Sequence, residues 1–471
     1  MAKEGLWESI SEHISLTRST IAQHCSKILT LKGFLRPGDQ FKCLEDVGEG
    51  YLEDLVNRSL ILVNKKGSNG KFESIGIHDL LREICIKKAK EEGFLHHVSF
   101  EMNSWKDAEP NLNRRISIHF TKSSEECRIQ DSSACSLLLF SKRNWRSRLY
   151  LSCRRLIILD APEVTWMNFS DVISLFIDLR YIAFALNHTT CPNGFPAPLY
   201  KLPNLQTIIT HKNDYRPLKI PYEIFGMPKL RHLITVIPFR LSNIAKITSI
   251  HESDLQTLET VINCSFTEEL IKILVNLKRL KVDFDMENDH WDDLNLNNLF
   301  QLQKLEELEI TVRQHNRLMI WKHAFPVGLK KLTLQGVPLA WENMTIIGSL
   351  PNLQVLEMMY ICAPEFSEWI PMEGQFLRLK YFRCSLDNVI KWEVEKEHLP
   401  SLESLILAYA TFIEEIPFGI GEIDSLQLIE LWFCTKSLVN SAQRIHEQQH
   451  ENGNHDFQVR VFGSTEKIYA I

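Results

Sequence analysis

The sequence contains no run of uncharged apolar residues long enough to span a bilayer, which takes about 18 residues or more. Its N-terminal segment, from Met1 to Ile10, carries charged residues and has no apolar core of signal-peptide length. The 11 cysteines include no C-x-x-C pair, and the two closest, Cys127 and Cys135, lie eight residues apart. These absences predict a cytoplasmic protein with reduced thiols, and they leave a nuclear or peripherally membrane-bound location open.

The chain also lacks an excess of charge of one sign. Its net charge is −6 over 471 residues and its pI is about 6.3, so the overall charge does not attract nucleic acid or an anionic membrane. Charged residues make up 24% and hydrophobic residues 44%, which excludes wholesale disorder and allows large cores. We therefore expect proteins, rather than nucleic acids, as partners.

A phosphate-binding loop of the form G-x-x-x-x-G-K-[ST] is absent. The segment that comes closest ends in Gly70 and Lys71, but Lys65 stands where the first glycine belongs and Phe72 where Ser or Thr is needed. Such a loop needs its backbone N–H groups, its lysine and its magnesium-binding hydroxyl together. We expect no nucleotide cofactor. Because the sequence also has no G-x-S-x-G nucleophile motif, we predict that the chain is not an enzyme.

One pattern near the C-terminus is typical of a zinc site. His446-Glu447-Gln448-Gln449-His450 fits H-E-x-x-H, in which two histidines on one helix face bind zinc and the glutamate acts as a base. Asp456 is a candidate third ligand. The polar surroundings favour a solvated C-terminal capping helix, followed by a last strand over 458–462. We predict no metal, and a zinc protease is kept as a remote alternative.

The sequence does contain a repeat. From about residue 150 onward the phrase Leu-x-x-Leu-x-x-apolar recurs, for example over 202–208, 227–233 and 350–356. Its central leucines are spaced on average about 25 residues apart, within the roughly 20–29 residues of leucine-rich repeats. They are Leu205, Leu230, Leu258, Leu277, Leu305, Leu329, Leu353, Leu379, Leu402 and Leu426, with weaker copies at Leu137, Leu156 and Leu179.

This spacing predicts an α/β fold, a leucine-rich-repeat solenoid over 136–440 with a C-terminal cap over 441–471. One repeat cannot bury its own leucines, so stacked repeats share a core and their strands form a curved parallel sheet. Helical solenoids, the alternative, repeat every ~34 residues or more with 3.6-residue faces. Because side chains alternate along a strand, Leu356 and Met358 should point inward, and Val355, Glu357 and Met359 outward.

The outward strand positions are the candidate protein-interaction residues. We predict one row made of Arg279, Glu307, Lys331, Val355, Tyr381 and Ser404. A second row is made of Lys281, Glu309, Thr333, Glu357, Arg383, Ile406 and Glu430. Tyr381 and Trp432 are candidate hot spots, because aromatic residues dominate interface energetics.

Residues 1–100 differ from the repeats. The pattern predicts a helix over 45–56, a strand over 59–63, a hairpin-like turn over 65–71, a second strand over 72–77 and a second helix over 79–90. This order is that of a winged helix. DNA binding is an alternative, but the helix before the wing is acidic, which is wrong for a recognition helix, so we expect a packing or switch role. Residues 101–135 are the expected linker into the repeats.

Five segments together resemble a known family. They are Glu45 to Leu62, the triad Ile77-His78-Asp79, the segments 114–119 and 221–233, and the tail 445–462. These segments resemble plant NB-ARC leucine-rich-repeat disease resistance proteins, in particular the late blight resistance protein homologues. By this resemblance the chain is a truncated and internally shortened C-terminal part, in which the winged helix is a remnant of the NB-ARC region.

The resemblance implies a function. In the family, the histidine of the triad contacts the phosphates of ADP in the resting state, so His78 would be a vestigial contact and Asp79 its partner. The repeat domain recognises a pathogen effector or a host protein in the hypersensitive defence response and restrains the nucleotide switch. Related receptors would supply NB-ARC or coiled-coil partners. The alternative is that this chain is itself an ADP- or ATP-binding switch.

Overall fold

The structure, a computed structural model, falls into two compact units, Met1–Leu255 and Gln256–Ile471, which are described separately. It describes the following residues: 20–21, 44–68, 70–92, 96–100, 115–120, 126–129, 134–141, 145–151, 153–166, 169–186, 195–212, 217–242, 252–285, 296–313, 325–337, 339, 341–361, 367–386, 389–463 and 469–470.

The first unit begins with the predicted winged-helix elements. They are α3 (Leu44–Asn57), β2 (Leu62–Lys66), β3 (Phe72–Gly76) and α4 (Asp79–Glu91). β3 pairs antiparallel with β2 and with the short β1 (Thr20–Ile21), which gives a three-stranded sheet. The strand predicted from Ser59 begins only at Leu62. Ser59 instead ends α3 in a left-handed conformation with φ 58°, a common way to close a helix.

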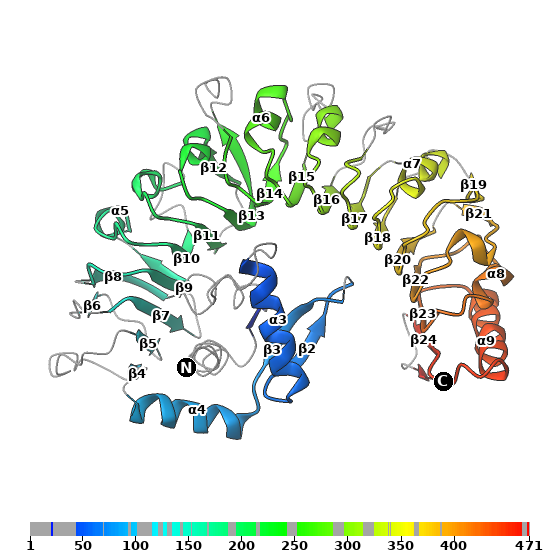
Figure 1. Cartoon of the computed structure of the whole chain (residues 1–471), viewed down its shortest axis with the longest axis horizontal. Helices are drawn as coiled ribbons and strands as arrows, with labels where there is room; N and C mark the ends of the chain where they lie inside the picture. Colours follow the sequence, from blue (N-terminus) through cyan, green and yellow to red (C-terminus); the bar gives the residue numbers. More distant parts are fainter. Residues whose placement is uncertain are drawn as a thin grey trace. The chain divides into compact units, whose positions relative to one another are not determined.

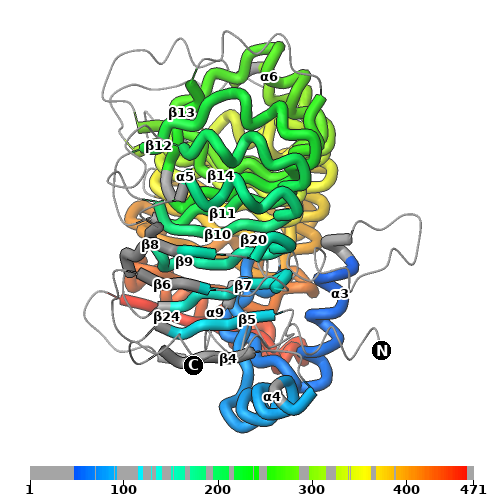
Figure 2. Tube along the Cα trace, turned by 90° about the vertical axis from the view of Figure 1, so that its left-hand side faces the viewer, coloured from blue at the N-terminus to red at the C-terminus, as the bar shows by residue number. Residues whose placement is uncertain are grey.

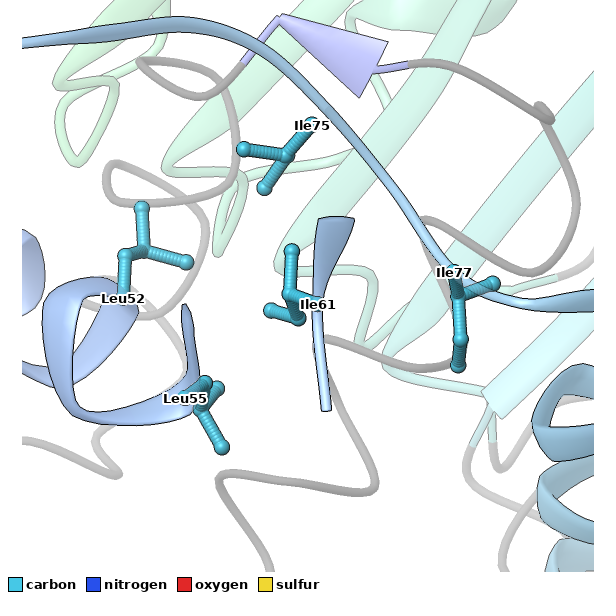
Figure 3. Close-up of a cluster of buried hydrophobic side chains, with 5 residues drawn as sticks. All are labelled: Leu52, Leu55, Ile61, Ile75 and Ile77. Atoms are coloured by element: carbon cyan, nitrogen blue, oxygen red, sulfur yellow. The ribbon is translucent and has the colours of Figure 1, made fainter. Parts of the chain in front are cut away.

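A small apolar core holds these elements together. α3 contributes Leu52 and Leu55, and the strands and their flanks contribute Ile61, Ile75 and Ile77 (Figure 3). Each of these side chains is at most 8% exposed. The periodic spacing of Leu52 and Leu55 places both on one face of the helix, which therefore packs on the sheet.

The wing is a tight turn between β2 and β3. The N–H of Gly67 donates to the carbonyl of Lys71 at 2.8 Å, and Gly70 adopts φ 75°, which a glycine tolerates best. Lys71 pairs with Glu49 of α3 at 2.8 Å, so the turn is tied to the preceding helix.

The rest of the first unit is a mainly parallel sheet. Its main strands lie in the order β4-β5-β7-β9-β10-β11-β13. In addition, β6 pairs with β8, β8 pairs with β9 and β12 pairs with β13. Figure 2 shows β5, β7, β9 and β10 lying one above another. The strands are β4 (His96–Phe100), β5 (Arg115–Phe120), β6 (Glu126–Ile129), β7 (Ser136–Ser141), β8 (Trp145–Leu151), β9 (Ile158–Trp166), β10 (Tyr181–Leu186), β11 (Thr207–Lys212), β12 (Leu218–Pro221) and β13 (His232–Ser242), and the helices are α5 (Phe169–Ile173), η2 (Ala197–Lys201) and η3 (Tyr222–Gly226).

The sheet starts earlier than the predicted boundary at residue 136. β5 lies within the segment 101–135 that was expected to be a linker, and it pairs in register with β7. Its alternating sequence explains the difference, because Ile116 and Ile118 are both at most 2% exposed and therefore belong to the repeat core.

The second unit is a regular parallel sheet with the order β14-β15-β16-β17-β18-β20-β22-β23-β24. Its strands line the inner side of the coil, and α6, α7, α8 and α9 lie on the outer side (Figure 1). The sheet strands are β14 (Thr257–Ile262), β15 (Arg279–Phe284), β16 (Glu307–Val312), β17 (Lys331–Gln335), β18 (Val355–Met359), β20 (Tyr381–Ser385), β22 (Ser404–Ala408), β23 (Leu428–Trp432), β24 (Gln458–Phe462) and the antiparallel β25 (Tyr469–Ala470).

Short helices and one small sheet connect these strands. They are α6 (Glu268–Ile273), η6 (Leu296–Gln301), η7 (Trp341–Asn343), α7 (Met344–Gly348), η8 (Lys396–His398), α8 (Phe418–Gly421) and α9 (Lys436–Glu451), with the parallel pair β19 (Ser367–Trp369) and β21 (Val389–Trp392). Trp369 stacks on Trp392 at a ring distance of 5.6 Å. This stack contributes to the core between the small sheet and the main one.

The leucine repeat forms the predicted spine. From Leu205 to Leu426, each central leucine identified in the sequence is at most 2% exposed. Parallel strands at a spacing of one per repeat, rather than helix pairs, connect these leucines. The leucine-rich-repeat fold is thereby confirmed, and the helical solenoid is excluded.

A polar ladder that the sequence did not predict runs beside the spine. The residue before a central leucine donates a side-chain hydrogen bond to a carbonyl of the preceding repeat: Asn204 to Ile177 at 3.1 Å, Asn352 to Val327 at 3.2 Å and Ser401 to Leu377 at 2.8 Å. A cation at the same position of the next repeat donates to the asparagine: Lys229 to Asn204 at 2.7 Å and Arg378 to Asn352 at 3.1 Å. The ladder satisfies carbonyls that the turns leave open.

The C-terminal segment 441–471 was predicted as a solvated cap, but its described residues 441–463 are integrated into the fold. α9 starts before this boundary, capped by the Thr435 hydroxyl, and β24 extends the sheet by pairing with β23. Leu438 and Ile445 of α9 are at most 5% exposed. Gln449 is also buried, and its amide donates to the Gly421 carbonyl at 2.7 Å. The helix is polar in composition, yet one face packs on the last repeats.

Candidate protein-interaction surface

The two predicted outward rows exist as continuous rows in the second unit. The first row aligns Arg279, Glu307, Lys331, Val355, Tyr381 and Ser404 on neighbouring strands. The second row aligns Lys281, Glu309, Thr333, Glu357, Arg383, Ile406 and Glu430. Because each central leucine sets the phase of its strand, these side chains leave the sheet on the face opposite the leucine spine.

Charges of alternating sign pair across the strands. Arg279 lies 2.9 Å from Glu307 and 3.6 Å from Glu259, a partner that the sequence did not indicate. Lys281 pairs with Glu309 at 2.6 Å, and Lys331 with Glu357 at 2.9 Å. These partly exposed pairs each contribute little stability, about 1 kcal/mol or less. A ligand on this part of the sheet therefore meets charges that already have partners.

Two predicted contact residues are not accessible. Val355 and Ile406 are each 3% exposed, so the prediction that they offer contact area is wrong. Val355 lies in its row between Lys331 and Tyr381, both of which have longer side chains. Alternation along a strand predicts the direction of a side chain, but its exposure depends on the neighbouring strands.

The aromatic residues continue beyond the predicted rows. Trp432 is half-buried, its Nε1 donates to Glu430 at 3.4 Å, and its ring stacks on Phe462 at a centroid distance of 4.0 Å. Glu430 also accepts from Arg460 at 3.2 Å. The predicted hot spot Trp432 is thus part of a pair whose second ring lies on the last parallel strand.

A set of aromatic residues that the sequence-based prediction missed lies directly after the strands. We call Tyr360, Tyr409 and Phe433 the aromatic edge. They follow β18, β22 and β23, and all have positive φ values, 54°, 53° and 53°. The ring of Tyr409 lies 6.0 Å from Tyr360 and stacks on Phe433 at 5.3 Å. The sequence did contain a signal for these residues, because each of them is the seventh residue after a central leucine.

The other candidate site is the winged helix. Over Leu44–Asn57, α3 contains no lysine or arginine, so it lacks the cations with which a recognition helix contacts DNA phosphates. Its Glu49 is engaged by the wing residue Lys71. The described geometry is that of a packed helix and wing.

Comparison with known proteins agrees with the winged-helix part of the structure. Residues 26–85 match the family described as the disease resistance protein winged helix domain. This match covers α3, β2 and β3 and the start of α4.

Similarity to relatives extends over most of the chain. Two late blight resistance protein homologs of Solanum demissum are each 28% identical, over 453 and 442 residues, which is 89% of this chain and 56% and 34% of theirs. A late blight resistance protein of the same species is 27% identical over 440 residues, 87% of this chain and 33% of its own. The chain thus spans about half the length of one relative and a third of the other two. A leucine-rich-repeat protein of Leptospira interrogans aligns with a TM-score of 0.36 and 14% identity over 70% of this chain and 90% of its own.

Within this winged helix, His78 and Asp79 have structural roles. Both are exposed, and the Nδ1 of His78 accepts the N–H of Leu80 at 3.3 Å at the start of α4. Asp79 is the first residue of that helix, where a carboxylate faces the positive end of the helix dipole. The nucleotide contact assigned to this pair by resemblance stays a prediction.

The H-E-x-x-H pattern does not form a metal site. His446 is half-buried and Glu447 and His450 are exposed on α9, and the Nδ1 of His450 lies 3.1 Å from the Nδ1 of His455. In the parts of the chain that the structure describes, no three His, Cys, Asp or Glu side chains are grouped to hold a metal ion. The zinc-protease alternative therefore has no structural support.

The described cysteines are thiols that form no disulfide bond: Cys85, Cys135, Cys153, Cys264, Cys384 and Cys434. Burial raises the pKa of the Cys264 thiol to about 12. It also raises the pKa of Cys434, against the effect of hydrogen bonds from the backbone. A thiol with a raised pKa is a poor nucleophile, so these two residues fill the core. None of the described helices combines the length and apolar character that crossing a membrane requires.

Proposed function

We propose that this chain acts in plant disease resistance by binding a protein, either a pathogen effector or a host protein, with the outward face of its repeats. The observation that carries this proposal is the two rows of charged and aromatic side chains, held in register over consecutive strands of the second unit. The similarity to late blight resistance proteins supports the biological setting. A surface of this kind recognises a partner by complementary charge and shape and needs no catalytic group.

The same proposal includes restraint of a nucleotide-dependent switch. The match to the winged helix of disease resistance proteins and the similarity to late blight resistance proteins support it. The outward row of the first unit made of Ala183, Ile209 and Ile234 is buried within this chain, so we do not assign the contact to these residues.

We further propose that the chain binds no ADP or ATP by itself. The sequence offers no phosphate-binding loop, and His78 uses its Nδ1 to cap α4. Its place of action is the cytoplasm, which the lack of disulfide bonds among the described cysteines supports.

A photocrosslinking experiment tests the binding proposal. The crosslinker benzoyl-phenylalanine replaces Glu309 or Ser404 on the outward face, or Glu397 on η8 as a matched exposed control. Each protein is incubated with extracts of infected and uninfected Solanum leaves, and adducts are identified by mass spectrometry. We expect one protein to be crosslinked at an outward position and not at Glu397. Equal labelling at all three positions would show that the outward face is not a specific binding surface.

A further inference from the structure

The aromatic edge occupies a backbone position that suits other residues better. The equivalent place after a strand is held by Gly336 with φ 66° and Asn263 with φ 48°, the two residue types that tolerate this conformation. At Tyr360, Tyr409 and Phe433 the chain instead keeps bulky aromatic side chains in it. Their presence is not explained by the turn itself, because glycine or asparagine would form it with less strain.

These aromatic side chains form one accessible surface. Tyr360 is 46% exposed and Phe433 40%, and the ring of Tyr409 connects them. Leu386, which follows the strand between Tyr360 and Tyr409, is fully buried, so the two tyrosine rings meet above it. The N–H groups of Tyr409 and Phe433 each donate to the end of the next strand at 2.9 Å, which holds the edge in place.

Most outward residues next to this edge are also apolar. The last outward position is Met359 on β18, Ala408 on β22, Trp432 on β23 and Phe462 on β24, whereas β20 has the polar Ser385 there. On β15 the same position is Asp283, which pairs with Arg313 at 2.6 Å. The apolar character is therefore confined to the C-terminal repeats of the second unit. Stacked, pre-positioned rings lose little conformational entropy on binding, which suits an anchor site.

One cation next to this surface makes no ion pair with any described residue. Arg383 lies on β20 in the second outward row, where its neighbour Glu357 is already paired with Lys331. Its Nε is buried without a hydrogen bond from the described part of the chain. The other cations of the two rows, Arg279, Lys281 and Lys331, are paired, and so is Arg460 on β24. A partly buried guanidinium without a partner favours binding of a carboxylate.

Arg383 and the aromatic edge belong to one site. Ser385 lies two residues after Arg383 on β20, and its hydroxyl accepts the N–H of Tyr360 at 2.7 Å. A ligand that reaches the guanidinium thus also reaches the first ring of the edge.

We propose that this surface binds an acidic segment of a partner protein. A carboxylate of that segment pairs with Arg383, and an adjacent large apolar side chain packs on Tyr360, Tyr409 and Phe433. This inference rests on the proposed protein-binding function. It adds the position of the contact and the chemistry of the segment that is recognised.

The test uses the full chain and fluorescent synthetic peptides, with binding measured by fluorescence anisotropy. The first peptide alternates glutamate and tryptophan with glycine-serine spacers. The second replaces each glutamate by lysine, the third replaces each tryptophan by serine, and a thymidine oligonucleotide is the fourth probe. We expect the first peptide to bind and the other three probes to bind about tenfold or more weakly.

Two variants and one matched control locate the site. Arg383→Gln removes the cation, and Tyr409→Asn removes the central ring while keeping a residue that tolerates positive φ. Each should weaken binding of the first peptide about fivefold or more, the loss expected for one desolvated contact. Arg444→Gln on α9 is the control: it also removes a cation, but one that lies outside the two rows and is paired with Glu415 at 2.7 Å, so this variant should bind like the unchanged chain.

The outcomes separate this inference from the proposed function. Unchanged binding in both Arg383→Gln and Tyr409→Asn, or equal binding of the lysine peptide, would overturn the inference. So would absence of binding by the unchanged chain, or preference for the oligonucleotide. Crosslinking at Glu309 alone would then still support protein binding elsewhere on the array. A thermal melt of each variant shows whether a loss of binding reflects unfolding, and Tyr409→Asn provides a second reading if Arg383→Gln does not fold.

Discussion

The outward rows of the two units present different chemistry on the same kind of sheet. In the first unit, Tyr181, Ala183 and Ile209 lie on neighbouring strands and are buried. In the second unit, the corresponding positions carry charged side chains such as Lys281 and Glu309, which remain partly exposed. The inward leucines are equally buried in both units. The leucine spine therefore specifies the fold in both units. The outward residues differ in charge and burial between the units, because they do not contribute to the core that the leucines share.

The largest expected effect comes from the buried leucine spine, which both units contain. Leu205→Ala in the first unit and Leu402→Ala in the second should each lower the free energy of unfolding by about 2–5 kcal/mol, because each opens a cavity in the spine. Both leucines are 0% exposed. Urea denaturation followed by circular dichroism measures the effect. A loss confined to one of the two variants would contradict the view that one kind of core runs through both units.

The second prediction compares the stability that outward residues contribute in the two units. Ile209→Ala should cost about 1.5–3 kcal/mol, the value of burying one isoleucine side chain. Lys281→Ala should cost at most about 1 kcal/mol, because its partly exposed ion pair with Glu309 is screened by solvent. The same denaturation experiment compares them. If the two variants lost equal stability, the outward faces would not differ as their burial indicates.

A smaller loss is expected from the polar ladder. Asn352→Ala removes the bond to the Val327 carbonyl and the acceptor of Arg378, and it should cost about 1 kcal/mol. Glu373→Ala, an exposed change in the following repeat, serves as a control and should stay within about 0.5 kcal/mol. If Asn352→Ala left the free energy of unfolding unchanged, water would replace these hydrogen bonds in the variant.

The last prediction is that nucleotide does not change the melting temperature of the chain. A ligand that binds the folded state raises the melting temperature by mass action, so saturating ADP or ATP should leave it unchanged if the chain does not bind nucleotide. Differential scanning fluorimetry measures this for the unchanged chain, with His78→Ala as the comparison. A nucleotide-dependent rise that His78→Ala abolishes would establish the alternative of a nucleotide switch.

Local sequence patterns predicted the elements of the winged helix but did not predict the aromatic edge. The elements from 44 to 91 appear in the predicted order because apolar periodicity and turn residues are local signals. The aromatic edge was missed although the rings of Tyr360 and Tyr409 lie 6.0 Å apart, because their separation along the chain hides the contact. Only the stacking of repeats brings the two rings together.

The sequence by itself determined the repeat length, the leucine spine and the rows in which outward residues align, since these follow from spacing along one strand. Only the tertiary structure decided the burial of Val355 and Ile406, the pairing of Arg279 with Glu259, and the lack of an ion pair between Arg383 and the described residues around it. The reason is that burial and pairing depend on the side chains of the strands on either side. Those neighbours lie about 25 residues away in the sequence, so no local pattern carries the information.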